Sequence, residues 1–325
     1  MTTEAADTLR IGSAPPQAST GRALSVAKRR VPLAHRLWAG NTGPVFVVVL
    51  AIVALWYVAA VFANWQGVAD AFGRAGEQRS AVEILAGTME QERPVLPAPH
   101  QILVELKKTV IDIPVTSRRS LVNHAWVTLS STLAGFAMGA LLGIVLAVLI
   151  VHVRTLERSL MPWIISSQTI PILAIAPIVI VVLGSIGITG LIPKAIISAY
   201  LCFFPVTIGM VKGLSSPDVI QRDLMRTYSA SQGQIFWKLR LPASLPFLFA
   251  SLKVAVAISL VGAIVAELPT GAQAGLGARL LAGSYYGQTI QIWAALFAAA
   301  IVASVLVALV GFAERAVNRR MGVRP

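Results

Sequence analysis

The residue types that most often bind metals or form covalent intermediates are few and widely separated in this chain. Its four histidines are His35, His100, His124 and His152, and no two of them have a spacing that would bring them to one metal ion. Cys202 is the single cysteine and stands inside an apolar run, so the chain cannot form a disulfide with itself or a thiolate metal site. The sequence therefore predicts no metal site, and Cys202 is interpreted as a small buried side chain.

Motifs for nucleotide binding and hydrolysis are absent as well. The phosphate-binding loop GxxxxGK[ST], the GxSxG nucleophile turn and the zinc-binding HExxH helix do not occur. We therefore expect this chain to be no enzyme and to bind no cofactor. If ATP is used, its hydrolysis is expected on another polypeptide.

The composition is that of a membrane protein. Of the 325 residues 56% are hydrophobic and 13% are charged, whereas about a quarter of the residues in soluble domains are charged. The formal net charge is +13, but the basic residues stand beside apolar runs and form no stripe with interleaved aromatic residues. This pattern indicates that the basic residues orient the chain in a membrane. It does not favour a nucleic-acid partner.

Six apolar runs are long enough to cross a bilayer, which takes about 20 residues. The predicted fold is an all-α membrane protein with six transmembrane helices. The expected spans are 44–63, 126–151, 161–183, 191–211, 245–266 and 290–312. The expected regions are a disordered basic cytoplasmic tail at 1–43, the first transmembrane helix at 44–63, an extracytoplasmic segment at 64–124, a core at 125–315 and a basic cytoplasmic tail at 316–325.

The basic residues predict the orientation of these spans. With the N-terminus in the cytoplasm, both tails, the Arg154–Arg158 turn and the Lys212–Arg240 loop fall on the cytoplasmic side. The positive-inside rule therefore predicts cytoplasmic N- and C-termini.

Polar side chains inside the apolar runs are candidates for a translocation path, because at bilayer depth they must face protein or water. Gln168 and Thr169 stand in the third run beside two prolines, and the alternative is that they only bond to neighbouring helices. Further candidates for the path are Tyr200, Thr207, Lys253 and Glu267. Lys253 has a second interpretation, in which its long side chain reaches the lipid headgroups.

Three glycines in the second run lie on one helical face, since Gly135, Gly139 and Gly143 recur every fourth residue. Such a face lets another helix approach closely. Two partners remain open for it, a helix of the same chain or a helix of a second copy.

The longest polar stretch in the second half of the chain separates the fourth and fifth runs. Ser216 is a suitable N-cap before Pro217, and Ile220, Leu224 and Tyr228 then recur every four residues. The sequence predicts a short amphipathic helix, which either docks on a partner or lies flat on the membrane. Its other face carries Arg222, Asp223 and Arg226.

This loop resembles the signature of the permease subunits of bacterial ABC importers, which reads Glu-Ala-Ala, three residues, Gly, nine residues, Ile, one residue and Leu-Pro. The matching positions are Asp223, Leu224, Met225, Ser229, Leu239, Leu241 and Pro242. The spacing is kept, but Ser229 replaces the glycine of the signature, and serine enters a left-handed turn less readily. The taurine, sulfonate and nitrate branch is the most similar, since it has groups like Leu241-Pro242-Ala243-Ser244-Leu245-Pro246, Leu252-Lys253 and Ala266-Glu267 at these places. Gly275-Leu276-Gly277 is similar to a Gly-Leu-Gly segment of the family.

The resemblance implies a permease core at 125–315, with a cytoplasmic coupling helix between helices four and five in the 213–244 loop. It further implies a bacterial cytoplasmic (inner) membrane location, a second permease copy, a cytoplasmic ABC ATPase dimer that binds the ATP, and an extracytoplasmic solute-binding protein. The residues expected to contact the ATPase are Asp223, Leu224, Arg226, Thr227, Tyr228, Ser229, Phe236, Leu241 and Pro242.

Two other functions remain open at this point. An ion-gradient-driven transporter would be favoured by paired carboxylates within the spans, and none is found. A membrane anchor or sensor would not need polar residues and prolines in its third span. For the substrate, a small sulfonate-, taurine- or nitrate-like anion and a neutral pyrimidine or vitamin-precursor heterocycle rank equally.

Overall fold

The computed structural model describes residues 42–76, 80–269 and 274–321, and within these ranges it is helical without strands. The chain divides into two units, 1–52 and 53–325. The described part of the first unit is the start of α2 (Thr42–Arg74), whose side chains from Val45 to Leu50 are apolar and exposed. The expected N-terminal tail lies outside the described residues.

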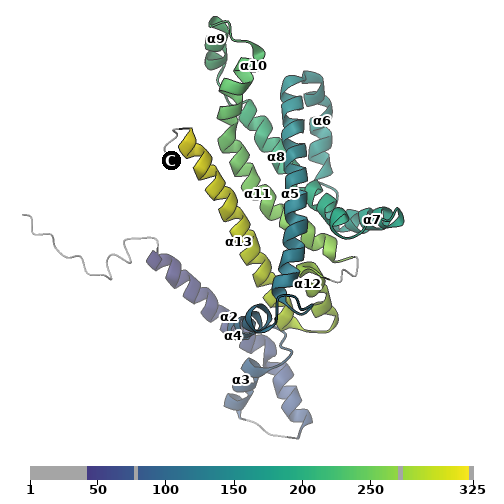
Figure 1. Ribbon diagram of the computed structural model, residues 1–325. Helices are drawn as coiled ribbons and strands as arrows, with labels where there is room; N and C mark the ends of the chain where they lie inside the picture. Colours follow the sequence, from purple (N-terminus) through teal and green to yellow (C-terminus); the bar gives the residue numbers. More distant parts are fainter. Residues whose placement is uncertain (1–41, 77–79, 270–273, 322–325) are drawn as a thin grey trace, which may run out of the picture. The chain divides into compact units, whose positions relative to one another are not determined.

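The second unit holds the remaining helices, which Figure 1 shows in sequence colours. They are α3 (Ala81–Glu90), α4 (Pro99–Lys107), the π-helix η1 (Lys108–Asp112), α5 (Leu121–His152), α6 (Arg154–Ser167), α7 (Ile172–Ser185), α8 (Leu191–Leu214), α9 (Val219–Thr227), α10 (Gln232–Ile235), the π-helix η2 (Phe236–Arg240), α11 (Leu241–Glu267), α12 (Leu276–Tyr285) and α13 (Thr289–Arg320). The all-α fold is thus confirmed.

Five helices or continuous helical stretches of the described chain are long and apolar enough to cross a membrane. They are Gly43–Arg74, Leu121–His152, Leu191–Leu214, Gln232–Glu267 and Thr289–Arg320. The first helix therefore continues past Ala63, where its expected span ended. No proline interrupts residues 64–74, so nothing in this stretch forces the helix to end.

The third expected span, 161–183, is not one straight helix. It is divided between α6 and α7, which meet at an angle of 97° across a break of four residues. Pro171 lies at the end of this break, where its missing N–H and its restriction of Ile170 both oppose a continuous helix. The described residues therefore contain six elements long and apolar enough to span a membrane if the bent pair counts as one.

The glycine face of α5 packs on α8. A Cβ atom added to Gly135 would lie 2.4 Å from Cβ of Ser198, and one added to Gly139 would lie 2.7 Å from the carbonyl oxygen of Ala199. At Gly143 the nearest atom, the Phe203 carbonyl oxygen, would be 2.8 Å away. Because only glycine permits this approach, the partner of the glycine face is a helix of the same chain.

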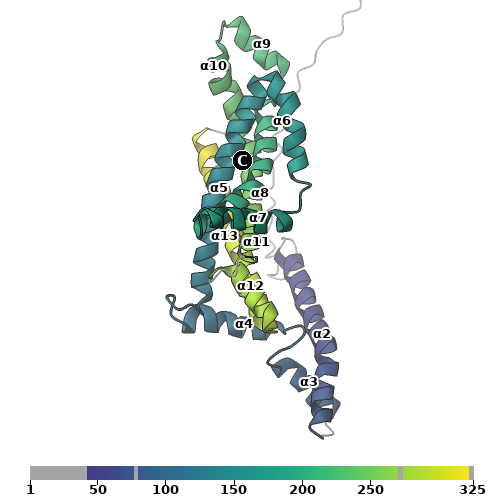
Figure 2. The same ribbon diagram turned by 90° about the vertical axis from the view of Figure 1, so that its right-hand side faces the viewer.

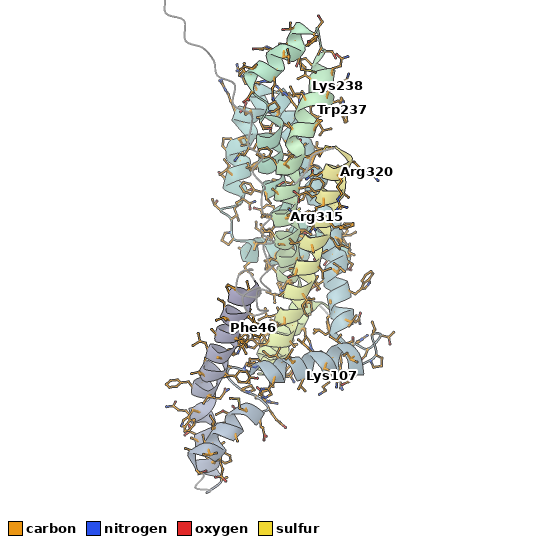
Figure 3. The ribbon with its side chains drawn as sticks, turned by 90° about the vertical axis from the view of Figure 1, so that its left-hand side faces the viewer. Phe46, Lys107, Trp237, Lys238, Arg315 and Arg320 are labelled. Atoms are coloured by element: carbon orange, nitrogen blue, oxygen red, sulfur yellow. The ribbon has the colours of Figure 1, made fainter. Side chains whose placement is uncertain are left out.

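The α5, α8, α11 and α13 bundle has two differently built ends. Figures 1 and 2 show α9 and α10 at one end, toward which the C-terminal end of α13 also points, and α4 and α12 at the other. In Figure 3, Trp237 and Lys238 mark the first end and Lys107 the second. Arg315 and Arg320 lie on the part of α13 that runs toward the first end.

Candidate functional site

The polar loop between α8 and α11 contains the expected short helix, α9, which begins two residues later than predicted. Asp218 is its N-cap, and the backbone N–H of Asp218 donates to Oε1 of Gln221 at 3.2 Å. The hydroxyl of Ser216, the predicted cap, instead donates to the carbonyl of Gly213 at 2.8 Å. The Asp-x-x-Gln pairing satisfies the start of the helix, so Pro217 lies before the helix and not in its first turn.

The end of α9 is closed by Ser229 in a left-handed conformation. Its φ is +53°, the only positive φ of a non-glycine residue in the described chain. The N–H of Ser229 donates to the carbonyl of Arg226 at 2.8 Å, and that of Ala230 donates to the carbonyl of Met225 at 3.0 Å. These two bonds form a Schellman motif, in which glycine is the favoured residue. The backbone at position 229 is left-handed, which explains why the signature has glycine there. In this chain Ser229 occupies that position.

The apolar face of α9 is exposed. Ile220, Leu224 and Tyr228 are 82%, 56% and 78% accessible. Asp223 and Arg226 flank them with an ion pair of 3.3 Å, and the hydroxyl of Thr227 donates to the carbonyl of Asp223. A helix of nine residues that leaves three large apolar side chains in contact with solvent has the surface of a docking element.

Phe236 and Leu241 were expected on the same contact surface, but the structure places them against the bundle. Both side chains are half-buried and pack on the cluster of Met210 and Leu214. The Phe236 ring also lies edge-on to His152 of α5, with ring centroids 5.2 Å apart. These two residues therefore attach the loop to α5 and α8. Much of their apolar surface is in contact with the same chain. Pro242 is exposed.

Of the residues expected to line a translocation path, Tyr200 lies next to the segment of Gln168 and Thr169, whereas Thr207, Lys253 and Glu267 have their partners elsewhere. Gln168 and Thr169 are exposed in the α6–α7 break, and the hydroxyl of Tyr200 donates to the carbonyl of Ser167 beside them. Thr207 is fully buried and donates to the carbonyl of Phe203 on its own helix at 2.8 Å.

Lys253 was expected to reach the lipid headgroups or to line the path. Its ammonium is ion-paired with Glu314 of α13, with side chains 35% and 20% exposed. This contact joins α11 to α13 in the half of the bundle nearer the 213–244 loop.

Glu267, the last of these candidates, is the centre of a buried polar cluster at the α12 end of the bundle. Its side chain is inaccessible to solvent. Oε1 lies 3.3 Å from Nζ of Lys194, and Oε2 accepts from the N–H of Gly277 at 2.9 Å and from Oγ1 of Thr128 at 3.0 Å. His124 joins the cluster by accepting the N–H of Gly275 on Nδ1 at 3.0 Å. The carboxylate thus binds α5, α8 and the start of α12 to the end of α11.

The cluster can form only because residues 275 and 277 of the Gly-Leu-Gly segment have no side chain. A Cβ on Gly275 would lie 2.2 Å from Cδ of Glu267, and a Cβ on Gly277 would lie 2.3 Å from the carbonyl oxygen of Ile264. Gly275 also has a φ of +131°, which side chains rarely permit. The two glycines therefore allow the backbone to come within bonding distance of the carboxylate.

Sequence reasoning found Glu267 but missed its partners Thr128 and Lys194, as well as His124, which binds the N–H of Gly275 in the same cluster. The spacing of His124 and Thr128, four residues apart on one helical face, was a usable signal. Lys194, near the start of an apolar run, was a second signal, because an ionisable residue at that depth calls for a partner.

Comparison with known proteins identifies similar chains among transport permeases. The formylaminopyrimidine transport permease ThiX of Halalkalibacterium halodurans is 33% identical over 183 residues, which cover 56% of this chain and 68% of that protein. The riboflavin transport system permease RibX of Chloroflexus aurantiacus is 32% identical over 199 residues, or 60% and 71% of the two chains. The putative aliphatic sulfonates transport permease SsuC of Bacillus subtilis is 26% identical over 233 residues, or 72% and 80%.

Residues 139–323 match a family that is described as the inner membrane component of binding-protein-dependent transport systems. The match begins at the second glycine of the α5 face and includes the 213–244 loop, Glu267 and the Gly-Leu-Gly segment. It covers more than half of the chain and all of α13. The chain therefore belongs to the family of binding-protein-dependent transport system inner membrane components.

Proposed function

We propose that this chain is the permease subunit of an ATP-driven importer and that α9 is its coupling helix. The observation that carries the proposal is the exposed apolar face of α9, with Ile220, Leu224 and Tyr228 beside the Asp223–Arg226 pair. A cytoplasmic ABC ATPase dimer would cover this face and would hydrolyse the ATP. The attachment of Phe236 to His152 then links the docked loop to the transmembrane helices.

The same proposal orients the chain in the inner membrane. It places the 213–244 loop, the α5–α6 turn and the C-terminal end of α13 in the cytoplasm, together with the N-terminus. Basic residues support this choice, because Arg154, Lys238, Arg319 and Arg320 belong to these segments. The α4 and α12 end is then extracytoplasmic, where a solute-binding protein would deliver the substrate to a pair of permease copies.

Among the relatives, ThiX and RibX are named for a formylaminopyrimidine and riboflavin, and SsuC for aliphatic sulfonates. We infer a small organic solute of one of these two kinds, a neutral heterocycle or a sulfonate-like anion.

The test is co-purification of the tagged chain from its native membrane under gentle detergent conditions. The variant Asp223→Arg, Tyr228→Ala reverses the charge at position 223 and removes the aromatic ring from the exposed face of α9. A matched control, Asp112→Arg with Tyr285→Ala, makes the same changes at exposed positions in η1 and α12. Wild type and control are expected to retain a nucleotide-binding ATPase, and the α9 variant is expected to lose it.

Absence of any ATPase from a well-folded wild type would contradict the proposal. It would favour an ion-gradient-driven transporter instead.

A further inference from the structure

A cavity of about 810 Å³ lies beside the Glu267 cluster. Its walls come from α5, α7, the turn before α8, the first residues of α8, and Pro269 and Ala274 between α11 and α12. The walls are mainly apolar, with hydroxyl groups from Ser130, Ser131 and Thr189. This volume is within the range of about 300–1,000 Å³ that small-molecule sites occupy, and the mixture of apolar walls and few polar groups is typical of them.

The cavity wall carries no net charge in its described part. Lys194 is the only ionisable residue among those that line it, and its side chain is 13% exposed. Its charge is balanced by Glu267, which has no accessible surface and pairs with it at 3.3 Å.

The two members of the Lys194–Glu267 pair differ in the hydrogen bonds that they can offer to a solute. The Glu267 side chain has no accessible surface and accepts from Thr128, Gly277 and Lys194, so the carboxylate offers the cavity no acceptor. The ammonium of Lys194 has three N–H groups. Two of them have acceptors in the described chain, Oε1 of Glu267 at 3.3 Å and the carbonyl of Ala274 at 3.4 Å. One N–H therefore remains for a molecule in the cavity.

We propose that this cavity is a solute site for an uncharged molecule with a hydrogen-bond acceptor, such as a ring nitrogen or a carbonyl group, and that the Lys194–Glu267 pair sets this preference. An anion would leave water for an apolar cavity whose one cation is already neutralised, and that transfer is costly. An uncharged molecule with an acceptor loses less hydration free energy on entering the cavity and can accept a hydrogen bond from the free N–H of Lys194. The inference rests on the proposed function and narrows its two solute classes to the neutral one.

Cysteine labelling tests the cavity directly, because Cys202 is fully buried and leaves little background. Ser130→Cys places a thiol in the cavity wall. This residue is half-buried and its hydroxyl donates only to the carbonyl of Val127 on its own helix. Ser284→Cys, at an exposed position of α12, is the reference. Membranes opened to both sides are treated with methanethiosulfonates that carry a hydroxyethyl, a sulfonatoethyl or a trimethylammonioethyl group.

The neutral reagent is expected to modify Cys at position 130. At position 130 the modification rate with the sulfonatoethyl reagent is divided by the rate with the trimethylammonioethyl reagent. A wall without net charge should keep this ratio within about threefold of the same ratio at position 284. Glu267→Gln leaves Lys194 unbalanced, so it should raise the ratio at position 130 by about tenfold. The double variant Lys194→Gln, Glu267→Gln removes both charges and should return the ratio to that of the parent.

Two results would overturn the inference. If none of the reagents modifies position 130 while position 284 reacts, the cavity does not admit solutes. If the parent already prefers the sulfonate reagent about tenfold over the reference, the site selects anions. Both results come from the parent background, so they decide the matter even if Glu267→Gln fails to fold. Labelling needs no ATPase, and failure here therefore remains distinct from failure of the co-purification.

Discussion

The backbone N–H of Leu276 donates to Oγ1 of Thr128 at 2.8 Å, although 148 residues separate the two in the chain. Thr128 also lies within 3.1 Å of both carboxylate oxygens of Glu267. One hydroxyl therefore connects the N-terminal part of α5 with the first turn of α12 and the last residue of α11. This single side chain holds the polar cluster together across three elements.

Thr128→Val should lower the stability of the folded protein. The substitution keeps the shape of the side chain but leaves the N–H of Leu276 and part of the Glu267 carboxylate without a partner. A buried polar group without a partner costs about 1–3 kcal/mol. The midpoint of thermal unfolding in detergent micelles measures the loss. Ser304→Ala is the control, since that exposed hydroxyl bonds only to Ala300 on its own helix. Equal midpoints for the two variants would contradict the prediction.

Ser229→Gly should stabilise the end of α9. A left-handed conformation costs a non-glycine residue about 1–2 kcal/mol, of which part is recovered by the greater freedom of glycine in the unfolded chain. We expect a net gain of about 0.5–1 kcal/mol in the local stability of this helix end. It is measured as slower hydrogen exchange of the backbone amides at positions 229 and 230. Ser215→Gly, at a right-handed helix end, should give no gain. Faster exchange at position 230 in the Ser229 variant would count against the Schellman assignment.

Gly139→Ala should separate α5 from α8 and destabilise the fold. The added methyl group would lie 2.7 Å from the Ala199 carbonyl oxygen and from Sγ of Cys202. Overpacking of this kind costs about 1–3 kcal/mol, measured as a lower unfolding midpoint. Gly73→Ala, in α2, has no atom within 4 Å of the new methyl group. It should therefore be neutral or slightly stabilising. A neutral Gly139→Ala would mean that the two helices are not in close contact.

The ion pair between Lys253 and Glu314 should contribute little, because both side chains are partly exposed. A double-mutant cycle of Lys253→Met and Glu314→Gln is expected to give a coupling free energy of about 1 kcal/mol or less. Chemical unfolding of the four variants measures it. A coupling of several kcal/mol would show that the pair is shielded from water and joins α11 to α13 more firmly than its exposure indicates.

The fold was predictable where a local pattern determines it. Apolar length gave the five continuous spans, and the four-residue repeat of Ile220, Leu224 and Tyr228 gave α9. The bend between α6 and α7 was missed because 161–183 is apolar enough on average to count as one span, and hydropathy does not register a change in helix direction. The start of α9 was placed at Ser216 because either Ser216 or Asp218 satisfies the local rule for an N-cap.

The candidate site was less predictable, because its contacts join residues far apart in sequence. Phe236 belongs to an apolar-basic patch, and the sequence does not tell whether such a ring faces a partner or packs on Met210 of the same chain. Glu267 could be identified as an ionisable residue at a helix end, but its partners Thr128 and Lys194 lie 139 and 73 residues away. Only the folded chain brings these groups together.

The close contact of α5 with α8 has a mechanical consequence. Helices whose backbones touch along three successive turns tilt as one body, and α8 carries the 213–244 loop at one end and Lys194 near the other. With 24 residues, α8 is about 36 Å long. A tilt of about 5° around its loop end therefore moves Lys194 by roughly 3 Å, enough to break a hydrogen bond. A small rotation at the loop end thus becomes a change of bonding partners at the Glu267 cluster.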